Sequence, residues 1–147
     1  MKKIQRYEFV PYTPQQMFDL VNDVAKYPQF LPWCQKTHIA DQSDNHMEAS
    51  MHISKGPLHK AFTTLNRLIP HQRIEMRLKQ GPFKHLEGIW QFEALDQGTK
   101  VSFALSFEFQ NPLLAMTLGP LFHQIAQSMV AAFSKRATQV YANNVLA

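Results

Sequence analysis

The C-terminal stretch Asn111–Ala147, NPLLAMTLGPLFHQIAQSMVAAFSKRATQVYANNVLA, determines the fold that we expect for this chain. Asn111 is a good helix N-cap and Pro112 suits the first helical position, whereas Gly119 and Pro120 should break or kink the opening turns. Further along, apolar side chains recur at steps of three and four residues and polar ones take the opposite side. The apolar residues are Leu118, Leu121, Phe122, Ile125, Ala126, Met129, Phe133, Ala137, Val140 and Tyr141. The stretch therefore predicts one long amphipathic helix with a buried face.

A sheet must supply the surface that buries this helix, because no other stretch could form a second helix of similar length. Alternating apolar and polar residues predict six strands near 35–41, 46–54, 60–69, 72–80, 84–95 and 99–110, separated by turn signals. A first strand is expected at Lys3–Val10, with Tyr7 and Phe9 on one side and charged residues on the other, the pattern of a half-buried strand. Short connections between the strands favour an antiparallel meander.

Two short helices are expected between the first strand and the rest of the sheet. Thr13 and Pro14 form a helix start, and the apolar positions after them continue to about Val24. The run Tyr27–Cys34 has two prolines that prevent a long regular element, so we expect a short helix or turn there. The fold class predicted for the chain is α+β.

Length and composition indicate one domain, spanning residues 1–147. We expect no secretory signal, because the basic N-terminus leads into a strand pattern, and a reducing, cytoplasmic location, because Cys34 is the only cysteine. The net charge of +4 and the seven histidines favour anionic partners, such as lipid headgroups or RNA, without choosing between them.

Apolar connections are predicted to gather at one end of the sheet, since every second turn of a meander lies at the same end. They contain Gly56-Pro57-Leu58, Gly81-Pro82-Phe83, the exit of the last strand and Phe30–Trp33. Exposed apolar tips flanked by Lys and His would suit peripheral contact with an anionic inner membrane. The alternative is that each tip folds back into the core. The docking candidates are Lys55, Leu58, Lys60, Phe83, Lys84, Leu113 and Leu114.

The sequence contains no recognisable catalytic motif. It has no glycine-rich phosphate loop, no metal-ligand pair at helical spacing, no paired-cysteine motif and no nucleophile elbow. The histidines are scattered, and Cys34 is expected to act as a small apolar side chain beside Trp33. We therefore expect a protein that is not an enzyme and that uses no metal or cofactor.

Several motifs resemble the coenzyme Q-binding family, which joins mitochondrial coenzyme Q chaperones to the bacterial ribosome-association toxin RatA proteins. The similar segments are Val10–Val21, Tyr27–Cys34, Gly81–Phe83, Leu86–Phe92, Phe107–Phe109 and Phe133–Ala137. The resemblance implies the helix-grip fold of the START-like SRPBCC superfamily. In that fold a curved seven-stranded antiparallel sheet, in the order 1-7-6-5-4-3-2, surrounds the long helix and leaves a tunnel beside it.

The resemblance also implies a ligand, ubiquinone or a related isoprenoid lipid bound in the tunnel, in support of respiration or quinone biosynthesis. Thr64 and Asn66 are the candidates for hydrogen-bonding a quinone carbonyl, although Asn66 could instead bond to neighbouring backbone. The candidate ligand-binding residues are Phe30, Leu31, Trp33, Phe62, Thr64, Asn66, Met76, Leu78, Trp90, Phe92, Phe107, Leu121, Phe122, Ile125 and Met129.

A second hypothesis is a RatA-type factor that binds the large ribosomal subunit and blocks subunit association. Binding to RNA would depend steeply on salt, but the sequence has no dense Lys/Arg stripe and no aromatic RNA-recognition motif. The two hypotheses need not exclude each other. A cyclase-like enzyme, a label used for some members of the superfamily, is the third and weakest, because no acid and base pair supports it.

Overall fold

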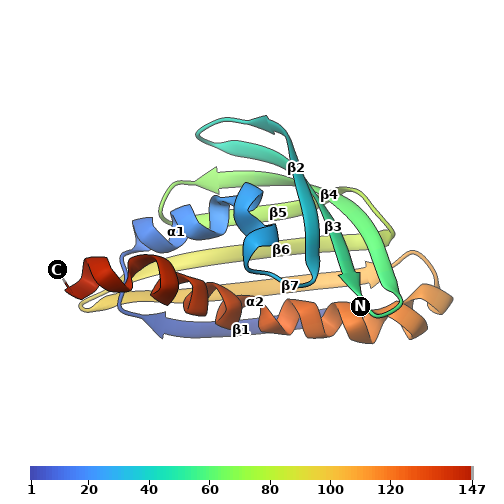
Figure 1. Cartoon of the computed structure of the whole chain (residues 1–147). Helices are drawn as coiled ribbons and strands as arrows, with labels where there is room; N and C mark the ends of the chain where they lie inside the picture. The colour runs from blue at the N-terminus through green and yellow to red at the C-terminus, as the bar shows by residue number, and fades with distance from the viewer. Residues whose placement is uncertain (147) are drawn as a thin grey trace.

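The computed structural model describes the backbone of residues 1–146 and the side chains of residues 1–142. The elements in chain order are β1 (Lys2–Val10), α1 (Pro14–Asn22), the 3₁₀ helix η1 (Val24–Gln29), β2 (Cys34–Gln42), β3 (His46–Lys55), β4 (Leu58–Ile69), β5 (Arg73–Gln80), β6 (Phe83–Leu95), β7 (Gly98–Phe109) and α2 (Pro112–Leu146). The strands form one antiparallel sheet in the order β1-β7-β6-β5-β4-β3-β2. Figure 1 shows α1, η1 and α2 on the same side of the curved sheet. The expected helix-grip architecture is confirmed.

The sheet buries one face and exposes the other, as strand alternation requires. Every second residue of β7, from Val101 to Phe109, is buried. On β1, however, the buried residues are Ile4 and Val10, whereas Tyr7 and Phe9 lie on the outer face and are 60% and 61% exposed. The pairing of Ile4 with Leu105 sets this register, so the expectation that the aromatic side of β1 is its buried side is wrong.

Capping residues define the starts of both α-helices. Thr13 and Gln16 form a capping box on α1, and the Oδ1 of Asn111 accepts the Leu114 backbone N–H at 2.9 Å. Of the break or kink expected at Gly119-Pro120, the break is wrong, because α2 continues through both residues. A proline ring normally clashes with the Cβ of the residue before it, and Gly119 has none. No helix in the described part of the chain combines the length and apolarity needed to cross a bilayer.

The predicted clustering of connections at one end is confirmed by hydrogen bonds between them. The Ser54 N–H donates to the Trp33 carbonyl at 2.8 Å, and the Gln110 N–H donates to the Pro82 carbonyl at 2.9 Å. Two of the expected exposed tips fold back instead, since Leu58 is 0% exposed and Phe83 is 4% exposed.

Aromatic packing explains why the Phe83 tip turns inward. The ring of Phe83 lies 4.7 Å from Phe109 and 5.0 Å from Phe122, measured between ring centroids. Burying such a side chain stabilises the fold by roughly 1.5–3 kcal/mol relative to leaving it in water. Leu58 and Phe83 are therefore core residues, and neither is available for docking.

Candidate functional site

A cavity of about 80 Å³ lies between the inner face of the sheet and α2. Its walls come from α1, η1, strands β3 to β7 and the middle of α2, and they are almost entirely apolar. The predicted ligand-binding residues that line it are Trp33, Phe62, Thr64, Asn66, Met76, Trp90, Phe122, Ile125 and Met129. The structure thus brings these residues from distant parts of the chain around one space.

The other six predicted residues belong to the hydrophobic core outside the cavity lining. Leu31, Phe92 and Phe107 are at most 5% exposed, and Phe30, Leu78 and Leu121 are partly buried against that core. Strand alternation placed Leu78, Phe92 and Phe107 on the inward face, and they pack in or against the core. The sequence does not reveal which inward side chains border empty space. Other apolar lining residues were not predicted: Val21, Val24, Tyr27, Ala49, Met51, Ile53, Ile74, Leu86, Phe103, Leu105 and Ala126.

Two polar side chains of β4 face this apolar space. Thr64 and Asn66 are each 7% exposed, and the Thr64 hydroxyl donates to the Asn66 Oδ1 at 2.8 Å. Asn66 lies between Met47 of β3 and Met76 of β5 in the sheet register. Among the described residues, no side-chain hydrogen bond uses the Asn66 amide group as a donor. A ligand carbonyl in the cavity could accept one.

Four apolar lining residues of the cavity on α2 and the strands β3 to β5 are partly exposed, and we call this group the methionine-rich seam. Helix α2 packs mainly on β1 and β7, and the partly exposed lining residues Met51, Phe62, Met76 and Met129 lie on the other side. Methionine is flexible enough to change the shape of such a lining. The expected mouth at the apolar loop tips stays a prediction, and the methionine-rich seam is a second place where the lining could part.

The volume limits what the cavity holds in this conformation. At about 80 Å³ it is smaller than the ~150 Å³ engineered cavity that admits benzene. It does not form the tunnel that the family resemblance implies. A quinone ring would enter only if side chains such as Met76 and Met129 moved aside.

The apolar surface at the start of α2 is smaller than expected and differs in composition. Leu113 is 68% exposed, Leu114 is partly buried, and Met116, which was not among the predicted residues, is 74% exposed. Their spacing of three residues puts Leu113 and Met116 on one side of the helix. Of the predicted lysines, Lys84 is exposed, and Lys55 and Lys60 are partly buried.

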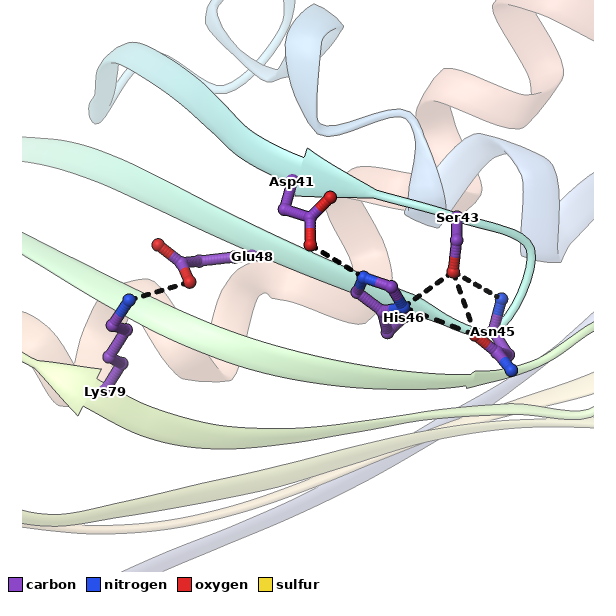
Figure 2. A network of polar contacts seen from close by, with 6 residues as sticks. All are labelled: Asp41, Ser43, Asn45, His46, Glu48 and Lys79. Atoms are coloured by element: carbon purple, nitrogen blue, oxygen red, sulfur yellow. Dashed lines mark hydrogen bonds and ion pairs between the residues drawn. The ribbon is translucent and has the colours of Figure 1, made fainter.

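A second hollow, of about 1070 Å³, lies on the outer face of the sheet and is lined mainly by polar and charged residues. Figure 2 shows the network at one side of it, where the Nε2 of His46 lies 2.9 Å from the Asp41 carboxylate and its Nδ1 lies 2.6 Å from the Ser43 hydroxyl. The hydrogen bond with His46 lowers the pKa of Asp41. These residues belong to one exposed hairpin, so the network fixes the β2–β3 turn and lacks the enclosed site of a catalytic triad.

The buried ionisable groups near the cavity are unsuited to catalysis. Burial raises the pKa of the Cys34 thiol to about 11 and raises the pKa of Tyr27 above its ordinary value. The Tyr27 hydroxyl donates to the Val21 carbonyl. Both groups stay protonated at neutral pH, so neither supplies a nucleophile or a general base.

Comparisons with known proteins agree with this architecture. The sequence model of the family described as polyketide cyclase / dehydrase and lipid transport matches residues 10–134. The chain belongs to this family. An 18 kDa protein from Caulobacter crescentus with a known solution structure is 31% identical, with a TM-score of 0.77 over 97% of this chain and 99% of that one.

Two relatives of this chain carry names that bear on function. A protein of Pseudomonas aeruginosa named ribosome association toxin RatA is 48% identical over 139 residues, which are 94% of this chain and 96% of that protein. A Xenopus laevis protein named mitochondrial coenzyme Q-binding protein COQ10 homolog B is 27% identical over 135 residues, which are 88% of this chain and 55% of that protein. The recognised resemblance to the RatA and coenzyme Q-binding proteins is confirmed.

Proposed function

We propose that this chain is a non-enzymatic protein that binds ubiquinone or a related isoprenoid lipid between the sheet and α2. The observation that carries this proposal is a mainly apolar cavity whose wall includes the hydrogen-bonded pair Thr64 and Asn66, besides the polar residues Asn22 and Ser50. Small-molecule sites are typically apolar with a few polar groups that orient the ligand. The relationship to a protein named for coenzyme Q binding supports this choice of ligand.

In this proposal the amide of Asn66 donates to a quinone carbonyl while the Thr64 hydroxyl holds the Asn66 carbonyl in place. The prenyl tail would follow the methionine-rich seam and displace the side chains of Met76 and Met129. Exposed Leu113 and Met116 would insert into the membrane interface, and Lys84 would face anionic headgroups. The protein would then collect its ligand while in peripheral contact with the bilayer.

Ligand binding can be followed by tryptophan fluorescence, because Trp33 and Trp90 both line the cavity and a bound quinone quenches indole emission. Titration with decylubiquinone should give saturable quenching. Ala126, which is 3% exposed and lines the cavity, can be replaced by Met to fill the space. The A126M variant should lose the quenching, whereas A131M, the same change at an exposed position of the same helix, should keep it. Equal quenching in both variants would contradict binding in the cavity.

Membrane contact is tested separately with vesicles that contain phosphatidylglycerol. The L113D/M116D variant should bind these vesicles more weakly than the wild type does. The L95D variant is the matched control, because Leu95 is 44% exposed at the end of β6 and lies outside the proposed docking surface. Equal loss in both variants would indicate a general charge effect and would remove the docking proposal.

A second candidate function is association with the ribosome, and the observation that favours it is the 48% identity to a protein named ribosome association toxin RatA. The chain would then bind the large subunit and prevent subunit joining. Co-sedimentation with purified large ribosomal subunits at two salt concentrations tests it, since contacts with RNA phosphates weaken steeply with salt. Absence of binding even at low salt would remove this candidate and would leave the lipid proposal untouched.

A further inference from the structure

Two aromatic side chains lie side by side on the outer face of the sheet, far from the cavity side. Tyr7 and Phe9 occupy successive outward positions of β1, and their ring centroids are 5.6 Å apart at an interplanar angle of 76°. Each is about three-fifths exposed, at 60% and 61%. Aromatic residues are normally largely buried, so an exposed pair on a regular strand indicates a contact surface.

Two lysines, Lys100 and Lys3, lie on the same outward face as this pair. The Lys100 ammonium lies over the Tyr7 ring, 4.7 Å from its centroid, although Glu93 is its cross-strand neighbour on β6. Lys3 is exposed on the same outward side of β1. Arg6 leaves β1 on the opposite side, where it pairs with buried Phe103, and its guanidinium donates to the Gln5 carbonyl at 2.9 Å.

Two of the acidic groups farther along the same face are engaged by cations. Glu75 is held by Arg73 at 2.9 Å and by Arg67 at 3.4 Å, and Glu48 is held by Lys79 at 2.8 Å. Glu93 is the acidic residue opposite Lys100 and forms no ion pair within the described residues. An anionic chain that approaches the aromatic pair would therefore meet two cations, Lys3 and Lys100, and the unpaired carboxylate of Glu93. Glu87 and Glu108, also without an ion pair in the described residues, lie farther along the face.

The register places polar side chains beside the rings. Gln5 precedes Tyr7 on the outward side of β1, Ser102 pairs with Tyr7 on β7, and Gln91 pairs with Ser102 on β6. Amide and hydroxyl groups of this kind hydrogen-bond to the edges of bases. The outer face thus combines stacking surfaces, cations and hydrogen-bonding groups in one place.

We infer that the outer face of β1 and β7 binds single-stranded RNA, with bases stacked on Tyr7 and Phe9 and phosphates near Lys3 and Lys100. Alternate residues of a strand are about 6–7 Å apart, so the two rings can receive two successive unstacked bases. A bilayer is a poorer fit, since membrane contacts use apolar side chains that project from helices or loops. If the chain associates with ribosomes, as in the second candidate function, this face would be the surface that contacts ribosomal RNA. RNA binding by the face can be measured without ribosomes.

The test is fluorescence anisotropy with a fluorescein-labelled oligouridylate of about 12 nucleotides, a length within the range that single-strand-binding modules cover. The Y7A and F9A variants should each bind about 5-fold to 100-fold more weakly, the loss expected for one stacked base. The Y7F and F9Y variants should restore binding, because each keeps a ring. M116A, a change at an exposed apolar residue of α2, should bind like the wild type. Circular dichroism would confirm that each variant is folded.

Electrostatics gives an independent readout. Replacing Lys100 by Met should reduce the slope of log affinity against log salt by about 0.7, the effect of one phosphate contact on single-stranded RNA. Replacing Glu93 by Gln should strengthen binding, because it removes the unpaired carboxylate beside Lys100. Unchanged slope and affinity in both variants would overturn the proposed path of the phosphates.

Several outcomes would overturn the inference as a whole. One is an absence of oligonucleotide binding by the wild type at low salt. Another is equal oligonucleotide binding by the wild type and Y7A/F9A. A third is a Y7A/F9A variant that loses only vesicle binding, which would assign the pair to a membrane. Loss of self-association in Y7A/F9A, measured by light scattering, with RNA binding intact, would assign the face to a second copy of the chain. If the oligonucleotide binds through Tyr7 and Phe9 but the chain does not co-sediment with ribosomal subunits, the inference stands and the ribosome candidate fails.

Discussion

Thr64 and Asn66 form a buried polar pair that should cost the free protein stability while serving a ligand. Their single mutual hydrogen bond of 2.8 Å satisfies the Asn66 carbonyl, and the amide faces an apolar cavity. A fully buried donor without a partner costs about 1–3 kcal/mol, and because the Asn66 amide nitrogen is not among the fully buried unpartnered atoms, its cost lies toward the low end of that range. A hydrogen bond between neutral groups contributes about 0.5–1.5 kcal/mol. The double variant T64V/N66L removes both groups and keeps similar shapes. Its free energy of unfolding should therefore lie between unchanged and about 2 kcal/mol higher.

The single variant T64V should behave in the opposite way. It leaves the Asn66 carbonyl as well as the amide without a partner, so it should lower the free energy of unfolding by about 1–3 kcal/mol. Urea denaturation followed by circular dichroism measures both variants. In thermal melts, a change of 1 kcal/mol corresponds to about 2–4 °C for a chain of this size.

Quinone titration completes the experiment. Loss of one hydrogen bond worth about 1 kcal/mol should weaken decylubiquinone binding by T64V/N66L roughly 5-fold. The reasoning would be refuted if the double variant were destabilised by more than about 2 kcal/mol, because the pair would then be a structural element of the sheet. Unchanged quinone affinity would equally refute the role of Asn66.

Three further predictions concern the backbone and the buried thiol. Replacing Gly98 by Ala should destabilise the fold by at least 2–4 kcal/mol in urea denaturation, by order of magnitude, because its Cβ would lie 1.9 Å from the Val10 carbonyl oxygen. Replacing Gly88 by Ala should change stability little but weaken quinone quenching, since its Cβ, 2.8 Å from the flexible Met76 Cε, would push that side chain toward the cavity. The raised pKa of Cys34 means that the folded protein holds the thiol proton more tightly than the unfolded chain does. The free energy of unfolding should therefore fall as the pH rises from about 9 to about 11. The C34A variant, which has no thiol, should show a smaller fall over the same range.

Much of the fold could be predicted because several local signals agree. Alternation on β7, the capping box at Thr13 and the start of α2 at Asn111 are encoded within a few residues each. Short connections then leave few topologies besides a meander. The exceptions have specific physical causes: Gly119 removes a clash that would otherwise stop a helix before Pro120, and the pairing of Ile4 with Leu105 turns the aromatic side of β1 outward.

The candidate site could be predicted only in part. Alternation identifies Phe62, Met76 and Trp90 as inward-facing, and all three line the cavity. It does not say where side chains leave a gap, so Phe92 and Phe107 were included although they pack solidly in the core. Exposure of loop tips depends on tertiary partners that the local sequence does not reveal. For that reason Phe83 was expected in water, and the exposed Met116 was missed.

Native mass spectrometry of the protein purified after incubation with ubiquinone-containing membranes tests the central claim most directly. The account predicts one isoprenoid quinone bound per chain in the wild type and in A131M, and a strong loss of this species in A126M, whose added side chain fills the cavity. A wild-type protein that remains free of quinone, or an A126M variant that carries as much quinone as A131M, would contradict it.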